Sequence, residues 1–154
     1  KCNLRCLHCL GDYDEACENE FAFEEWAKVI DDLASMNVFY LNISGGEPTQ
    51  HPDFEKIMDY LTYKGMHFIL TTNGVLSKKA LQCLLRNKEY LIGVKVSLDG
   101  YDAETHCAIR RSINQGFNPK IFEKTMDTIK VVKRENIPLT IATPTILWWP
   151  RWVW

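Results

Sequence analysis

Residues 38–74 read VFYLNISGGEPTQHPDFEKIMDYLTYKGMHFILTTNG, and this stretch decides the fold class. It holds two segments rich in strand-forming residues, 38–44 and 66–72, and each is followed by a turn that contains glycine. Between them, His51-Pro52 opens a segment with apolar residues at helical spacing, and Gly65 is expected to cap its end. The order strand, helix, strand predicts two parallel strands joined by a right-handed crossover.

The same alternation continues on both sides of this stretch. Further helices are expected from Phe23 to about Asn37, from Ser77, and from Asn118-Pro119, and further strands over residues 91–98 and 137–143. The pattern is typical of an α/β chain with a parallel sheet, and we expect helices to cover both faces of that sheet. Loops at the carboxyl ends of parallel strands meet at one edge, so the turns at Gly46, Gly74 and Gly100 are expected to converge there.

Length and composition exclude several classes of protein. The chain has 154 residues, 46% of them hydrophobic and 25% charged, with a formal net charge of -2. These values favour one globular domain over a disordered chain or a polycationic nucleic-acid binder, and no basic block could capture phosphates unaided. The chain opens with no signal-peptide pattern, and no apolar run reaches the roughly 18–20 residues of a spanning helix, so we expect a cytoplasmic protein without a membrane partner.

Three of the six cysteines cluster near the start of the chain. Cys2, Cys6 and Cys9 form a C-x3-C-x2-C pattern, which suits a loop around one metal centre. Structural zinc prefers four protein ligands, so three thiolates indicate a coordination position reserved for an exogenous group. The alternative is a non-catalytic interaction module that binds zinc or an iron–sulfur centre, in which His8 or Cys17 would complete a zinc site.

Four motifs in this order carry a family resemblance. They are CNLRCLHC at residues 2–9, SGGEP at 44–48, TTNG at 71–74 and SLDG at 97–100. Together they resemble the radical S-adenosylmethionine (radical SAM) superfamily, and within it the peptide- and cofactor-maturing branch that carries a SPASM or twitch extension. The resemblance implies a partial parallel (β/α)6 TIM-like barrel, incomplete at both ends.

The resemblance also implies the cofactors and the reaction. Cys2, Cys6 and Cys9 would ligate three irons of a [4Fe-4S] cluster, and the fourth iron would chelate the methionine part of SAM. Reductive cleavage of SAM gives a 5′-deoxyadenosyl radical, which abstracts hydrogen from a peptide, protein or cofactor precursor. An electron donor such as flavodoxin or ferredoxin is then required. A radical SAM enzyme that acts on RNA or a small metabolite is the remaining alternative, and no catalytic residue is assigned.

Seven residues are expected to bind SAM. Gly45 and Gly46 let the backbone approach the methionine, and Glu47 balances its ammonium group. The other four are expected to bond the ribose hydroxyls (Asn73, Ser97, Asp99) and the methionine carboxylate (Arg110). Because Asn-Gly and Asp-Gly are also common turn dipeptides, Asn73 and Asp99 either bind ribose or support the backbone.

Two segments are distinguished along the chain. Residues 1–143 correspond to an incomplete radical SAM core domain, and residues 144–154 form a tryptophan-rich tail that is an insertion, a join or a partner-binding segment. No cysteine follows Cys107, so no auxiliary iron–sulfur centre is assigned to this chain. The three isolated cysteines, Cys17, Cys83 and Cys107, are expected to be free thiols.

Overall fold

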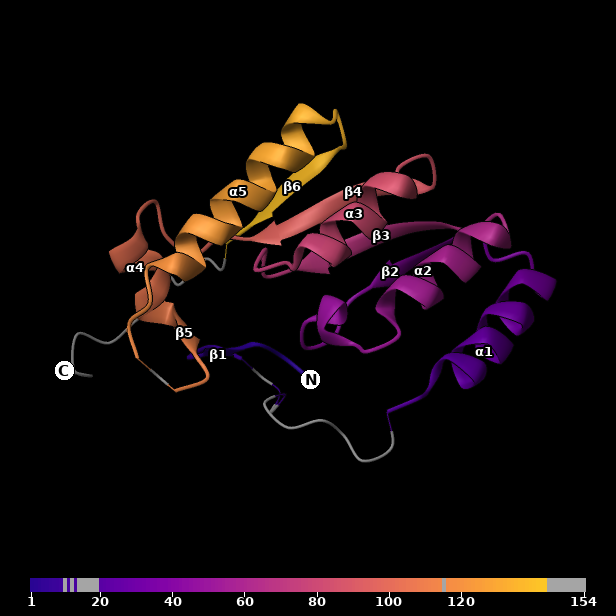
Figure 1. The fold of residues 1–154 in the computed structure, drawn as a ribbon, viewed down its shortest axis with the longest axis horizontal. Helices are drawn as coiled ribbons and strands as arrows, with labels where there is room; N and C mark the ends of the chain where they lie inside the picture. The colour runs from indigo at the N-terminus through magenta and orange to yellow at the C-terminus, as the bar shows by residue number, and fades with distance from the viewer. Residues whose placement is uncertain (10, 12, 14–19, 115, 144–154) are drawn as a thin grey trace.

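The computed structural model describes residues 1–9, 11, 13, 20–114 and 116–143 (Figure 1). In chain order the elements are β1 Leu4–Cys6, α1 Phe23–Ser35, β2 Tyr40–Ile43, η1 Pro48–Gln50, α2 Phe54–Tyr63, β3 His67–Thr72, α3 Lys78–Arg86, β4 Leu91–Ser97, α4 Ala103–Ile109, β5 Arg110–Ser112, α5 Lys120–Arg134 and β6 Leu139–Ala142. The tail at residues 144–154 and Cys17 lie outside the described residues.

A four-stranded parallel sheet forms the centre of the fold. Its strand order is β2-β3-β4-β6, and each neighbouring pair is parallel. The α/β class and the parallel sheet are therefore confirmed. Within the described part of the chain this sheet stays open and does not close into a barrel.

Among the described residues the helices cover one face of the sheet, and the expected helical cover on the other face is not found there. Alternate β3 residues, Phe68, Leu70 and Thr72, are buried, whereas the residues between them are half-buried. The buried strand residues share one apolar core with Met58 of α2 and Leu84 of α3, two helices that Figure 1 shows in front of the sheet. The strand order follows the chain without a reversal, so each right-handed crossover brings its helix to the same side.

The expected elements have shifted ends. The segment after the first glycine turn begins with the short helix η1, because Pro48 suits a first helical turn, and α2 starts only at Phe54. Ser77 caps α3 as predicted: its hydroxyl accepts a hydrogen bond from the N–H of Ala80 at 3.1 Å. Gly65 follows the last residues of α2 with a φ of 74°, a conformation that favours glycine.

The sequence did not predict the two short strands β1 and β5 or the helix α4. β1 and β5 form an antiparallel pair in which Leu4 faces Ser112 and Cys6 faces Arg110. A second small core, made of Leu4, Cys107 and Ile121, packs against this pair. The pair ties the cysteine segment to the chain that follows β4.

Every helix among the described residues is too short or too polar to span a membrane.

Candidate functional site

The predicted site residues meet at a cavity of about 160 Å³ at the carboxyl edge of the sheet. Five of the seven expected SAM-binding residues line it together with all three clustered cysteines. Its lining consists of Cys2, Cys6, His8, Cys9, Tyr13, Ser44, Gly45, Gly46, Thr71, Thr72, Asn73, Ser97 and Arg110. Glu47 and Asp99, the two expected carboxylates, do not line this cavity.

The sulfurs of Cys2 and Cys6 accept hydrogen bonds from the surrounding protein. Cys2 Sγ accepts from the N–H of Leu4 at 3.4 Å and from Asn73 Nδ2 at 3.8 Å, and Cys6 Sγ accepts from Arg110 Nη1 at 3.8 Å. Cys2, Cys6 and Cys9 are all free thiols. Donors of this kind stabilise thiolate ligands and tune iron–sulfur centres.

Burial opposes ionisation of these thiols in the protein alone. It raises the pKa of Cys6 to about 11, although the nearby Arg110 guanidinium acts in the opposite direction, and it also raises the pKa of Cys2. A bound metal would displace these protons, because metals coordinate the thiolate form.

Three thiols are a donor set that suits an iron–sulfur cluster. Three thiols from one segment of nine residues line a shared cavity. Among the described residues, no three His, Cys, Asp or Glu side chains converge on the position of a single metal ion. The His8 Nε2 atom lies 3.7 Å from Asp99 Oδ2. Cys17, the other fourth ligand considered for zinc, lies outside the described residues.

The two glycines of the SGGEP motif are required for different reasons. Gly45 has a φ of 144°, a conformation rare for other residues, and a Cβ added to it would meet no atom within 4 Å. A Cβ on Gly46 would lie 2.6 Å from the carbonyl oxygen of Lys1. Gly45 therefore keeps a turn, whereas Gly46 lets the cysteine segment pass close to the end of β2.

Glu47 is buried, with 2% of its surface exposed, and its carboxylate faces protein donors. Oε1 accepts from the Thr49 hydroxyl at 2.7 Å, the Thr72 hydroxyl lies 2.9 Å from both oxygens, and the N–H of Asn73 donates to Oε2 at 2.8 Å. Burial raises the pKa of Glu47, and these donors oppose that rise. The contacts join the end of β2 to the end of β3, and a contact with a bound ammonium group stays a prediction.

Asn73 is also engaged by the protein. Its Nδ2 donates to Asn3 Oδ1 at 2.7 Å, its Oδ1 accepts from the N–H of Val75 at 2.8 Å, and Asn3 Nδ2 in turn donates to the Val75 carbonyl at 3.1 Å. Of the two interpretations left open for Asn73, these contacts show backbone support, and its contact with ribose is untested. Asn3 was not singled out from the sequence, because its partners lie about 70 residues away.

Asp99 and Arg110 form a buried ion pair in which Arg110 lines the cavity and Asp99 does not. Arg110 Nε lies 2.7 Å from Asp99 Oδ2, but its N–H does not point at that oxygen, so this contact is an ion pair without a hydrogen bond. Arg110 Nη2 donates a hydrogen bond to Asp99 Oδ1 at 3.3 Å. The N–H of Asp99 donates to His106 Nδ1 at 3.2 Å. Burial lowers the pKa of His106, and the Arg110 charge adds to this effect. His106 has no partner pattern in the sequence and was not predicted to lie here.

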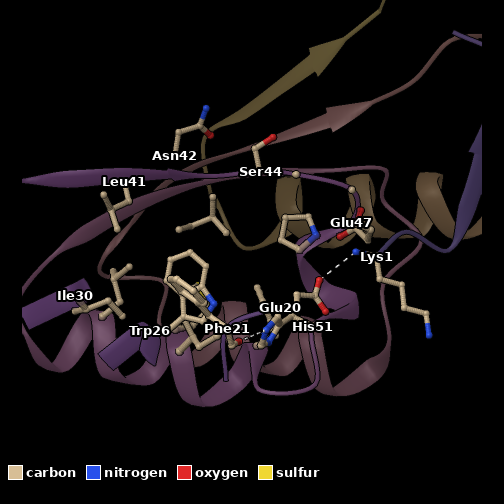
Figure 2. Close-up of a pocket in the computed structure, with 18 of the residues that line it drawn as sticks. Lys1, Glu20, Phe21, Trp26, Ile30, Leu41, Asn42, Ser44, Glu47 and His51 are labelled. Carbon is tan, nitrogen blue, oxygen red and sulfur yellow. Dashed lines mark hydrogen bonds and ion pairs between the residues drawn. The ribbon is translucent and has the colours of Figure 1, made fainter. Parts of the chain in front are cut away.

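A larger cavity of about 430 Å³ lies next to the site, between β2 and helices α1 and α2. Figure 2 shows Trp26 and Leu41 in its apolar part, with Glu20 and His51 among the polar side chains at its other end. There the main-chain nitrogen of Lys1 lies 3.2 Å from Glu20 Oε1. Glu47 lines this cavity, which places that carboxylate between the two cavities.

Comparisons with known proteins agree with these motifs. The model of the Radical SAM superfamily matches residues 1–147. Mycofactocin maturase MftC of Mycobacterium tuberculosis is 40% identical over 109 residues, which are 71% of this chain and 28% of that protein. The AdoMet-dependent heme synthase of Methanosarcina barkeri is 36% identical over 146 residues, which are 92% of this chain and 39% of that protein. The chain thus spans well under half the length of both relatives.

Solved structures show the same fold. Streptococcus suis SuiB bound to its precursor peptide SuiA superposes with a TM-score of 0.75 and 20% identity, covering 91% of this chain and 30% of that one. The protein anSMEcpe with bound AdoMet gives a TM-score of 0.72 and 24% identity, covering 92% of this chain and 40% of that one. With the family match over nearly the whole sequence, these findings show that the chain belongs to the radical SAM superfamily of enzymes.

Proposed function

We propose that this chain forms part of the core domain of a radical SAM enzyme that modifies a peptide. The observation that carries the proposal is the cavity in which three cysteines meet the glycine-containing strand ends. Cys2, Cys6 and Cys9 would hold a [4Fe-4S] cluster there, next to the methionine part of SAM. When bound, these cofactors supply a 5′-deoxyadenosyl radical for hydrogen abstraction.

The protein's own residues bind and orient these groups. Arg110 has one further N–H on each terminal nitrogen beyond its contacts with Cys6 and Asp99, and these donors can pair with the methionine carboxylate. Gly45 presents backbone without a side chain to the cavity, and Ser97 lines it with a hydroxyl for the ribose. Glu47 holds the ends of two strands in place through Thr72 and Asn73.

The substrate class rests on the relatives. One relative is a mycofactocin maturase, and SuiB has been solved with a precursor peptide, so a peptide or protein substrate is the first proposal. The heme synthase relative covers 92% of this chain and favours a cofactor precursor as the second candidate. A one-electron donor such as flavodoxin or ferredoxin would complete the system.

We also infer that the open sheet is part of a (β/α)6 barrel. Its strand order follows the chain, and the described helices lie on one face, which is how strands and helices are arranged in a barrel. Residues 1–143 would then be the barrel segment, separate from the tail at 144–154.

Anaerobic reconstitution with iron and sulfide tests the cluster, and adding SAM and dithionite tests the reaction. We expect a four-iron chromophore and 5′-deoxyadenosine, and we expect Cys6→Ala to abolish both. Cys83→Ala is the matched control, because this buried thiol of α3 lies outside the lining of the cavity. Stoichiometric zinc without iron in anaerobically purified protein would contradict the proposal and favour a zinc-binding module.

A further inference from the structure

The guanidinium of Arg110 lies beside Cys6, one of the proposed cluster ligands. Cys6 and Arg110 face each other in the antiparallel pair of β1 and β5, and the N–H of Leu7 donates to the carbonyl of Ile109 at 3.0 Å. In this register Arg110 Nη1 lies 3.8 Å from Cys6 Sγ. Main-chain pairing therefore places the backbone of Arg110 opposite Cys6, and the guanidinium itself is held by its contacts with Cys6 and Asp99.

The cation is partly neutralised from behind. The side chain of Asp99 is fully buried and that of Arg110 is 10% exposed, and their closest charged atoms lie 2.7 Å apart. His106 fixes the position of Asp99 by accepting its N–H. The next residue has to be glycine, since a Cβ on Gly100 would lie 2.3 Å from the backbone nitrogen of His106. The Cys6 sulfur, the Arg110 guanidinium and the Asp99 carboxylate thus lie one behind the other.

We propose that Arg110 and Asp99 are positioning residues that set the reduction potential of the cluster by placing a partly neutralised positive charge beside Cys6. The inference rests on the proposed function, because it requires Cys6 to be a cluster ligand. Reduction adds one electron, and hence one negative charge, to the bound cluster. A nearby cation stabilises that charge and an anion destabilises it, and both effects are large where water is excluded.

The two residues should therefore act in opposite directions. Arg110→Gln removes the cation and should make the cluster harder to reduce. Asp99→Asn removes the anion but keeps an oxygen that can accept from Arg110 Nη2, and it should make the cluster easier to reduce. We expect the ratio of reduced to oxidised cluster, at a fixed ambient potential, to fall or rise about tenfold, which corresponds to about 59 mV for one electron.

The experiment is a redox titration of the reconstituted protein without SAM, followed by the electron paramagnetic resonance signal of the reduced cluster. Omitting SAM separates the effect of Arg110 on the cluster from any contact with the methionine carboxylate. Arg110→Lys keeps the charge and should restore most of the wild-type potential. The controls are Arg86→Gln and Asp59→Asn, which break an exposed ion pair of 2.8 Å between α2 and α3 and should leave the potential unchanged.

The outcomes separate the two proposals. A wild-type protein that assembles no four-iron cluster would refute the proposed function itself. A normal cluster whose potential is the same in Arg110→Gln and Asp99→Asn, or shifts in one direction in both, would overturn this inference alone. Loss of the cluster in both variants and in Arg110→Lys would also overturn it, because the residues would then be needed only for assembly.

Discussion

Replacing Gly46 with alanine tests whether the close approach of the cysteine segment to the end of β2 holds the site together. An added Cβ would lie 2.6 Å from the Lys1 carbonyl oxygen and 2.9 Å from its carbonyl carbon, against 3.4 Å for ordinary contact. Both atoms are backbone, so no side chain can rotate away. The two segments must separate by about 0.8 Å.

The expected cost follows from this overlap. Overpacking of well-packed structure costs about 1–3 kcal/mol of unfolding free energy. The separation also stretches the bond from the N–H of Glu47 to the Lys1 carbonyl, now 3.0 Å, whose loss adds about 1 kcal/mol. Urea unfolding followed by circular dichroism measures this sum. We also expect slower or incomplete cluster assembly, because the segment that carries Cys2 has moved.

Two other glycines serve as matched controls. Gly116 is exposed and has open space around its Cβ position, so Gly116→Ala should change stability by no more than about 0.5 kcal/mol. Gly65 has a φ of 74° with no atom in reach, so Gly65→Ala should cost about 1–2 kcal/mol without affecting the cluster. If Gly46→Ala matches Gly116→Ala in stability and in cluster content, the close approach does not constrain the site.

Three further substitutions test the core, a cap and a buried histidine. Leu70→Ala, at a fully buried β3 position, should lower the unfolding free energy by about 2–5 kcal/mol in urea, whereas Ile92→Ala, at 37% exposure, should cost much less. Ser77→Ala should cost about 1 kcal/mol by removing the cap of α3, and Ser77→Asp should restore most of it in the same assay. Folding lowers the pKa of His106 from its ordinary value of 6.5. Below about pH 6.5 the unfolded chain therefore binds a proton more readily at His106 than the folded chain does, and the free energy of unfolding should fall as the pH drops. His106→Asn should reduce this slope in unfolding curves at pH 5–7, and an unchanged slope would assign it to other groups.

The sequence predicted the parallel sheet because its strands and helices have strong local patterns. Residues 38–74 carry two apolar strands, a helix and two glycine turns within one stretch, and the structure confirms all of them with shifted ends. β1 and β5 have only three residues each and pair across about 100 positions, so neither periodicity nor turn residues could reveal them. The single covered face follows from the strand order, which local patterns do not specify.

At the site, residue types were easier to predict than their partners. Gly45, Asn73 and Ser97 meet at one cavity, as the rule for loops at the carboxyl ends of parallel strands predicts, whereas the antiparallel pair of β1 and β5 brings the cysteines there. The partners of the two carboxylates could not be read in the same way. Glu47 is bonded by residues about 25 positions away, and Asp99 by an arginine whose place depends on the unpredicted β5 strand.

These contacts separate residues that bind a cluster from residues that hold its binding segment. Three contacts support the segment at residues 1–9. The N–H of Glu47 donates to the Lys1 carbonyl, and Asn73 Nδ2 donates to the side chain of Asn3. Strand β1 pairs with β5, where Cys6 faces Arg110. Two of these supports follow β2 and β3 of the parallel sheet, and the third is the separate strand β5, so the spacing of the three sulfurs depends on several parts of the fold. Changes in the supports should therefore alter the rate of assembly or the potential of a cluster that still forms, whereas changes in the cysteines should remove it.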